Sequence, residues 1–252
     1  MILPIFGFIL GTALGSLSKA LADRSLNNGS FFGRSFCQNC KKKLNWHDLI
    51  PVVSYILLRG RCRYCGDRIG VDYLLVEAVM GILVGFLFWQ NPSDIIFKTF
   101  FITILVSLFL TDIKKMLIPD RLIIPSIYIA IFYLIITAVF KVEYIPLLWS
   151  FLTGGLIGGF FLSLIIITKG KGMGGGDVKL GFFLGLVLGF RSGLLAVMLS
   201  FLLGALVSLF LIFAGKKHFG QSIPFGPFLA AGSLTALFFG KEILSFYLNL
   251  TI

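Results

Sequence analysis

The chain has 252 residues, of which 58% are hydrophobic and only 13% are charged, and its mean hydropathy is +0.99. Soluble domains carry about 25% charged residues. The apolar residues gather in blocks long enough for a helix to cross the ~30 Å hydrocarbon core of a bilayer. This composition excludes an ordinary soluble enzyme, a disordered chain and a nucleic-acid-binding module, and it predicts an all-α polytopic integral membrane protein.

Apolar blocks bounded by charged residues or by Pro, Gly and Asn predict about eight transmembrane helices, since a span needs ~20 residues. They are expected at residues 2–18, 73–90, 95–111, 122–140, 146–168, 178–190, 192–214 and 223–240. No basic residue precedes the first block, so we expect a retained span and not a cleaved signal peptide. The predicted organisation is a first span at 1–18, a loop domain at 19–72 and a transmembrane domain at 73–252.

Glycines spaced four residues apart recur in several predicted spans. Such glycines share one face of a helix and allow two backbones to approach closely in a membrane. They predict the faces on which these helices pack together: Gly7, Gly11 and Gly15; Gly81 and Gly85; Gly154 and Gly158; Gly181, Gly185 and Gly189.

The net charge of +11 is unevenly distributed along the chain. Of the 22 Lys and Arg residues, 18 lie in four connections that all fall on one side of the membrane: 19–72, 112–121, 169–179 and 215–222. Positively charged loops stay on the cytoplasmic side. We therefore expect the large loop to be cytoplasmic and the N-terminus to lie outside.

All four cysteines lie in the large loop, as two C-x2-C pairs formed by Cys37, Cys40, Cys62 and Cys65. Two such pairs complete the tetrahedral S₄ shell that Zn²⁺ prefers, and the metal would help to fold so small a domain. A closed shell leaves no position for water, so we expect a structural metal. Iron uses the same ligands, so the sequence leaves zinc or iron open, whereas a reducing compartment disfavours disulfides. His47 is expected to be a solvated loop residue.

Two of the 11 carboxylates stand at the ends of apolar blocks: Asp112 follows residues 100–111, and Asp177 follows Gly174, Gly175 and Gly176. An Asp at bilayer depth costs ~2.5–3.5 kcal/mol or more, so such residues usually line functional cavities. Both are expected at the cytoplasmic ends of their spans, where they can meet. Two close carboxylates share a proton, so one can activate water while the other protonates a leaving group. The pair predicts peptide-bond hydrolysis without a nucleophilic side chain.

Each acid also has a purely structural interpretation. Asp112 could pair with Lys114 or Lys115 at a helix end, and Asp177 could be the N-cap of the following helix. Asp120 is expected to cap the fourth span and shape its loop, and Glu77 to pair with a loop arginine or line the cavity. The three glycines would let a substrate strand approach the backbone closely.

Several segments, taken in order, resemble type 4 prepilin peptidases, which are GxGD-type intramembrane aspartyl proteases. They are the two C-x2-C pairs, Pro51-Val-Val-Ser54-Tyr, Leu58-Arg-Gly-Arg-Cys62, Val76-Glu77, Ile118-Pro119-Asp120, Gly172-Met-Gly-Gly-Gly-Asp177-Val-Lys-Leu and Ile223-Pro-Phe-Gly-Pro-Phe. The chain departs from the family pattern at Gly15-Ser-Leu-Ser-Lys-Ala and at Val71-Asp72-Tyr73-Leu74.

The resemblance implies that Asp112 and Asp177 are the catalytic pair of a bacterial inner-membrane enzyme. The substrate would be a type IV prepilin or a pilin-like protein, whose short basic leader is cut after a glycine on the cytoplasmic side. Many members also N-methylate the new N-terminus with S-adenosylmethionine, an activity tied to the N-terminal loop and its zinc site.

Two other functions use the same residues. A proton-coupled carrier could relay protons through the Asp pair, but it should place its acids near the membrane midplane at broken helices. A membrane thiol oxidoreductase could use the Cys pairs, but it needs them on the outer side, against the distribution of cations.

Overall fold

The computed structural model describes residues 2–27, 31, 33–37, 39–91, 93–170, 173–216 and 223–250. Three residues used above lie outside the described ranges: the loop cations Lys171 and Lys217, and Gly172, which opens the glycine-rich segment. Within those ranges the chain is helical, with two isolated β-bridges and no longer strand. The expectation of an all-α membrane protein is confirmed.

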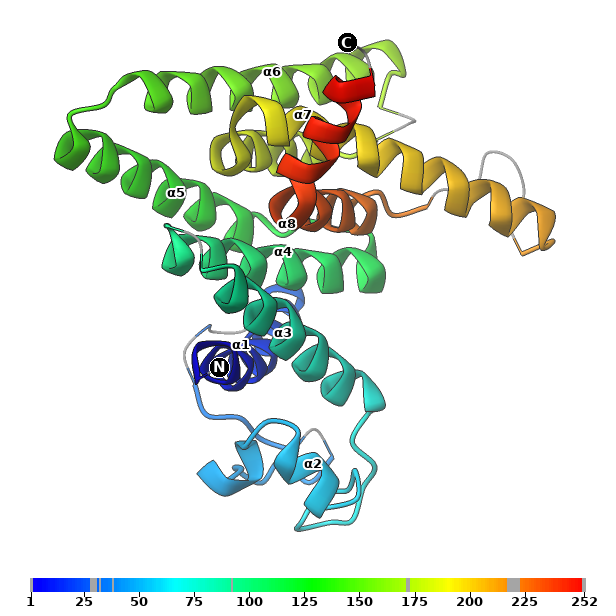
Figure 1. Cartoon of the computed structure of the whole chain (residues 1–252). Coiled ribbons are helices and arrows are strands. Elements are labelled where there is room, and N and C mark those ends of the chain that lie inside the picture. Colours follow the sequence, from blue (N-terminus) through cyan, green and yellow to red (C-terminus); the bar gives the residue numbers. More distant parts are fainter. Residues whose placement is uncertain are drawn as a thin grey trace. The chain divides into compact units, whose positions relative to one another are not determined.

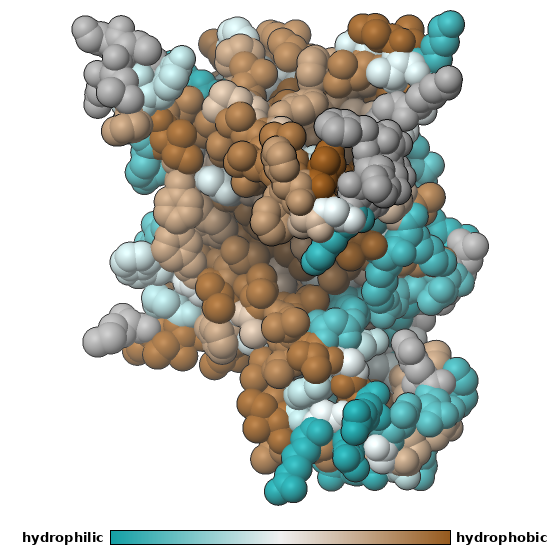
Figure 2. Space-filling view, turned by 90° about the vertical axis from the view of Figure 1, so that its right-hand side faces the viewer, coloured by the Kyte–Doolittle hydropathy of each residue, from teal (hydrophilic) through white to brown (hydrophobic). Residues whose placement is uncertain are grey.

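The helices follow one another in the order shown in Figure 1. They are α1 (Ile2–Leu26), the 3-10 turn η1 (Trp46–Leu49), α2 (Val53–Leu57), α3 (Val71–Gln90), α4 (Ile95–Lys115), α5 (Asp120–Lys141), α6 (Ile145–Ile167), α7 (Gly175–Phe213) and α8 (Gly226–Leu250). Seven of these, all but η1 and the short α2, are long and apolar enough to cross a membrane. The face drawn in Figure 2 carries a broad hydrophobic surface, as lipid-facing helices require.

The expected spans at 178–190 and 192–214 correspond to the two helical halves of α7, which has 39 residues in all. A straight helix of this length would measure about 58 Å, roughly twice the hydrocarbon core. The helix is broken at Gly189, whose φ of 69° and ψ of −175° are not helical. Glycine tolerates a positive φ because it has no Cβ. The expected boundary between the two spans therefore lies close to this break, and the ribbon of α7 changes direction in Figure 1.

The chain divides into two compact units, residues 1–107 and 108–252. In the first unit α1 packs along α3, and their glycines lie in the contact. A Cβ added at Gly11 would lie 2.5 Å from the Met80 carbonyl oxygen. The buried Lys19 of α1 forms an ion pair with Asp72 at the start of α3. The connection between these two helices, residues 27–70, holds all four cysteines.

In the second unit α7 packs against both α6 and α8. The α6–α7 contact is made by the predicted glycine faces: a Cβ added at Gly185 would lie 2.6 Å from the Gly154 Cα atom. An added Cβ at Gly181 would lie 2.4 Å from the Phe161 ring. This close packing fixes the position of the first half of α7, which begins at the Gly174–Asp177 turn.

Substitution of Gly185 by alanine is expected to destabilise this helix contact. No space exists for the new methyl group against the Gly154 backbone, and overpacking costs about 1–3 kcal/mol. The matched control is Gly155→Ala on α6, where an added Cβ meets nothing within 4 Å. Thermal unfolding of both variants in nanodiscs checks this: we expect a lower midpoint for Gly185→Ala only. Equal midpoints would contradict the α6–α7 packing.

Candidate active site and metal centre

Asp112 lies in the last turn of α4 with only 5% of its surface exposed. Its Oδ2 atom accepts a hydrogen bond of 2.8 Å from the backbone N–H of Gly226, the first residue of α8. The first N–H groups of a helix have no partner within that helix, and its positive end favours a carboxylate. The start of α8 therefore holds Asp112 in place.

Asp177 is the third residue of α7 and is 9% exposed. Its Oδ2 atom accepts the N–H of Gly174 at 3.3 Å, while its own N–H donates to the Gly174 carbonyl oxygen at 3.1 Å. Gly174 is thus the N-cap, and Asp177 closes the capping box from the third position. Asp112 is close enough to act electrostatically on Asp177. Both acids belong to the second unit.

Two further contacts bring the start of α5 to the same place. An added Cβ at Gly176 would lie 2.8 Å from the Cβ of Ile118, so the segment before α5 packs on the first turn of α7. Asp120 forms a 2.5 Å ion pair with Lys179 of α7. Pro119 occupies the N-cap, so Asp120 stands one residue inside α5. Its expected capping role is therefore replaced by a link between α5 and α7.

The pair keeps one face available for chemistry. Each backbone N–H donates to the Oδ2 atom of its aspartate. Among the described residues, no hydrogen bond reaches the Oδ1 atom of Asp112 or of Asp177. No residue in the described part of the chain lies within 4 Å of a Cβ added at Gly175, so these residues leave the turn beside Asp177 open. Two buried carboxylates, each anchored through one oxygen and open at the other, can position a water molecule and exchange its protons.

Glu77 belongs to the first unit, on α3. It is buried, and its Oε2 atom accepts the backbone N–H of Val52 at 2.7 Å. Glu77 therefore holds the loop onto α3 through the Val52 backbone. The sequence had suggested a loop arginine as its partner. Glu77 also lines a cavity of about 610 Å³ formed by α1, the loop and the start of α3. This cavity contains neither Asp112 nor Asp177.

The four cysteines form one cluster, with all Sγ atoms within 4.8 Å of one another. The two C-x2-C pairs lie in turns of the same kind. The Cys37 N–H donates to the Lys42 carbonyl and the Cys37 carbonyl accepts the Lys41 N–H. In the second turn the Cys62 N–H donates to the Asp67 carbonyl and the Cys62 carbonyl accepts the Gly66 N–H. Each turn is closed by an antiparallel bridge, Phe36 with Lys43 and Arg61 with Arg68. Two equivalent turns thus present two sulfurs each to one point.

This donor set fits a tetrahedral metal ion. Zn–S bonds of ~2.3 Å place tetrahedral sulfurs about 3.8 Å apart, and the Cys37 and Cys65 Sγ atoms are 3.8 Å apart. The Asp67 backbone lowers the pKa of Cys65, but burial and the three neighbouring thiols outweigh it and raise the pKa to about 12. Four sulfurs this close cannot all ionise unless a cation joins them. All four are free thiols, so the structure contains no disulfide among them.

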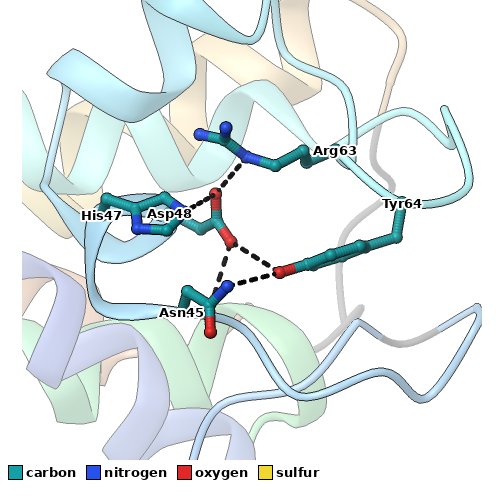
Figure 3. A network of polar contacts seen from close by, with 5 residues as sticks. All are labelled: Asn45, His47, Asp48, Arg63 and Tyr64. Carbon is teal, nitrogen blue, oxygen red and sulfur yellow. Dashed lines mark hydrogen bonds and ion pairs between the residues drawn. The ribbon is translucent and has the colours of Figure 1, made fainter.

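A polar network joins η1 to the second cysteine turn (Figure 3). Asp48 accepts hydrogen bonds from the Arg63 Nε atom at 2.7 Å and the Tyr64 hydroxyl at 3.4 Å, both from the second turn. Burial works to raise the pKa of Asp48, but hydrogen bonds from Arg63 and the Asn45 backbone and the Arg63 charge hold it below its usual range. The His47 Nε2 atom lies 3.6 Å from Asp48, outside the sulfur cluster. His47 supports this network and is not a fifth ligand.

Replacement of Cys62 by serine is expected to abolish stoichiometric metal binding. Cys62 is the buried member of the cluster, and a three-sulfur site loses both a ligand and the closed geometry. Elemental analysis of the purified protein should find about one zinc per chain in wild type and almost none in the variant. Equal zinc content, or iron in its place, would contradict the assignment.

Gly226 and Lys179 are site residues that sequence reasoning did not single out. The signal for Gly226 was present in the Ile-Pro-Phe-Gly-Pro-Phe segment, but its N–H reaches an acid 114 residues away in sequence. Lys179 follows Asp177 by two residues, and only the tertiary structure pairs it with Asp120.

Comparisons with known proteins match both parts of the chain. Residues 9–91 match the bacterial peptidase A24 N-terminal domain, and residues 99–209 match the type IV leader peptidase family. A prepilin leader peptidase/N-methyltransferase of Bacillus subtilis is 33% identical over 97% of this chain and 98% of its own. Relatives with the same name from Burkholderia pseudomallei (34%) and Aeromonas hydrophila (32%) cover 86% of this chain and 70% and 75% of their own.

No solved structure matches the chain. The B. subtilis relative aligns over nearly all of both chains, and the two matched domains contain the cysteine turns and the aspartate pair respectively. The chain therefore belongs to the type IV leader peptidase family.

Proposed function

We propose that this protein is an aspartic endopeptidase that removes the short basic leader of a type IV prepilin or pilin-like protein. The observation that carries the proposal is the aspartate pair: Asp112 and Asp177 are buried, interact electrostatically and are each anchored through Oδ2 alone. The relatives' printed name supplies the substrate class.

The proposed reaction follows from that arrangement. Two adjacent carboxylates share one proton, since both cannot ionise easily. The ionised member takes a proton from water, which attacks the scissile carbonyl carbon, while the protonated member donates to the carbonyl oxygen. The leaving amine then takes a proton from the pair. The open turn at Gly175 would accept the substrate strand, whose carbonyl must lie within hydrogen-bond reach of both Oδ1 atoms.

The distribution of cations supports a cytoplasmic site. We propose that the N-terminus lies outside the inner membrane, that residues 27–70 form the metal-binding cytoplasmic domain and that the remaining helices form the peptidase. The leader's basic residues stay in the cytoplasm by the same rule, so the scissile bond and the aspartates lie on one side. The acids lie at helix ends, which does not support a proton carrier. The four sulfurs form one closed cluster, which does not support a thiol oxidoreductase.

Incubation of the membrane-embedded protein with a prepilin tests the proposal. Mass spectrometry of the product N-terminus should show one cut, after the leader glycine, without added methyl donor. Uncut prepilin in the presence of folded, zinc-loaded protein would overturn it. A cut elsewhere would overturn the substrate assignment.

The cavity in the first unit favours methyl transfer as a second activity of the same protein. Its volume of about 610 Å³ lies within the range of small-molecule sites, and aromatic side chains and charges of both signs line it. S-adenosylmethionine would fit such a lining: Arg34 and Arg68 for its carboxylate, Asp23 and Glu77 for its cationic groups, and Tyr55 for its base. When bound, it supplies the methyl group, and a cavity carboxylate would take the proton lost by the pilin amine.

Calorimetric binding of S-adenosylmethionine to the Asp177→Asn protein, which is expected to be inactive as a peptidase, tests this second activity. Loss of a charge-assisted hydrogen bond costs ~1.5–3 kcal/mol, so Arg68→Ala should bind roughly tenfold or more weakly. Arg61→Ala is the matched control, because Arg61 pairs with Arg68 through the backbone but does not line the cavity. Equal affinity in the two variants would place the donor elsewhere.

A further inference from the structure

An exposed apolar face stands out on the otherwise polar metal-binding loop. It consists of Trp46, Ile50, Val53, Ile56 and Leu57, and hereafter is called the apolar face. Trp46 is 78% exposed, Ile56 62% and Leu57 77%. Val53, Ile56 and Leu57 share one side of α2, since residues three and four apart lie on the same face. The opposite side, Ser54, Tyr55 and Leu58, lines the cavity.

The apolar face lies beside a membrane-spanning helix. Val52, which begins α2, donates its N–H to Glu77, six residues into α3 and therefore about 9 Å along that helix. The charged Asp72, paired with Lys19, stands in the first turn of α3. The start of α2 therefore reaches further toward the hydrocarbon than this ion pair. Interfacial helices bury their apolar side at this depth, ~5–10 Å into the headgroup and acyl boundary.

The position of α2 is fixed by the backbone. Val52 has a φ of 62° and a ψ of −52°, a positive-φ conformation that is rare for a β-branched residue. Such a conformation persists only when surrounding contacts hold it, and the hydrogen bond to Glu77 is one of them. The Tyr55 hydroxyl donates to the Ile69 carbonyl at 3.3 Å, which holds the inner side of α2 on the loop.

The helix α3 carries an exposed apolar side of its own, and cations flank the apolar face in sequence. Exposed apolar residues follow one side of α3 at Val71, Leu75, Val79 and Ile82. Residues 27–70 carry eight Lys and Arg against two Asp. Of these, Lys41, Lys42, Lys43, Arg59 and Arg61 are exposed just before and just after the apolar face. Basic residues beside an apolar face complement an anionic lipid surface, at ~1 kcal/mol per cation.

We propose that the apolar face inserts into the bilayer entered by α1 and α3, so that the metal-binding loop is docked on anionic lipid. Trp46 and α2 then lie at the headgroup boundary, with the neighbouring cations among lipid phosphates. The cavity behind α2 is thereby held at the membrane surface. This docking is independent of the activities proposed above.

Fluorescence of Trp46 in the full-length protein tests the proposal. Trp89→Phe and Trp149→Phe leave Trp46 as the sole tryptophan of the three. The protein is reconstituted in phosphatidylglycerol/phosphatidylcholine nanodiscs with or without bromine atoms near the headgroup end of the acyl chains. We expect bromine to remove roughly half of the emission, because the indole lies in the acyl boundary. Aqueous iodide should have little effect.

Two variants sharpen the test. Ile56→Asp with Leu57→Asp should abolish quenching by brominated lipid while the zinc content stays at one per chain. Ile56→Val with Leu57→Met, which keeps the face apolar, should leave quenching unchanged. Iodide quenching without bromine quenching in the parent protein would overturn the proposal, because the face would then lie in water. Protection from both quenchers would also overturn it and would indicate that protein covers the face.

Discussion

Asp112→Asn and Asp177→Asn are each expected to lower the rate of leader cleavage by about 10²–10⁴-fold or more, the usual contribution of a general acid or base. Asparagine keeps the shape of the side chain and its carbonyl oxygen can still accept from Gly226 or Gly174. It cannot take a proton from water or share one with the other aspartate. The measurement is a single-turnover rate with purified protein in nanodiscs.

Glu143→Gln is the matched control, because this exposed acid lies in the α5–α6 connection, on the side of the membrane opposite to the proposed site. Its rate should equal that of wild type. Thermal unfolding should show that both Asp variants remain folded. Near-normal cleavage by either folded Asp variant would remove that residue from the proposed catalytic pair.

Gly226→Ala is expected to produce the second largest loss, although it removes no titratable group. A Cβ at this position would lie 2.6 Å from the Asp112 Oδ2 atom and 3.0 Å from its Cγ atom. Because both are in the same carboxylate, the side chain must move and its hydrogen bond to the α8 backbone must lengthen. Misplacement of a catalytic group by ~1 Å can slow a reaction about 10²-fold. The single-turnover cleavage rate measures this loss directly.

Gly240→Ala on the same helix controls for a general effect of alanine in α8. Its nearest contact for an added Cβ is the Ser192 Oγ atom at 3.5 Å, an ordinary van der Waals distance. We expect wild-type cleavage from Gly240→Ala. If Gly226→Ala also cuts at the wild-type rate, then the start of α8 does not position Asp112.

The fold was largely predictable because a bilayer leaves few choices. Backbone groups in lipid must be satisfied internally, so each long apolar block becomes a helix. The division of α7 was predicted to within a few residues, because Arg191 interrupts the apolar block, whereas the change of direction at Gly189 without a loop was not predicted. The glycine faces at Gly154 and Gly185 could be predicted, since four-residue spacing specifies one side of a helix.

The candidate site was predictable in its residues more than in its geometry. The cost of an Asp at bilayer depth identifies Asp112 and Asp177, and the C-x2-C spacing identifies the sulfur cluster. The bond from Gly226 to Asp112 and the Lys179–Asp120 pair depend on how distant helices meet, which local pattern does not encode. Similarly, Glu77 accepts the backbone N–H of Val52, whose positive φ could not be predicted from the sequence Pro-Val-Val.

We propose that Asp112 and Asp177 together activate a water molecule for attack on a peptide bond. The most direct measurement is the affinity of a prepilin leader peptide whose scissile amide is replaced by a hydroxyethylene group, which mimics the tetrahedral transition state. Transition-state analogues bind about 10²–10⁸-fold more tightly than substrates. The wild type should prefer the analogue over the unmodified peptide by at least 10²-fold, and Asp112→Asn and Asp177→Asn should lose that preference while still binding the unmodified peptide. Equal preference in all three proteins would contradict the claim.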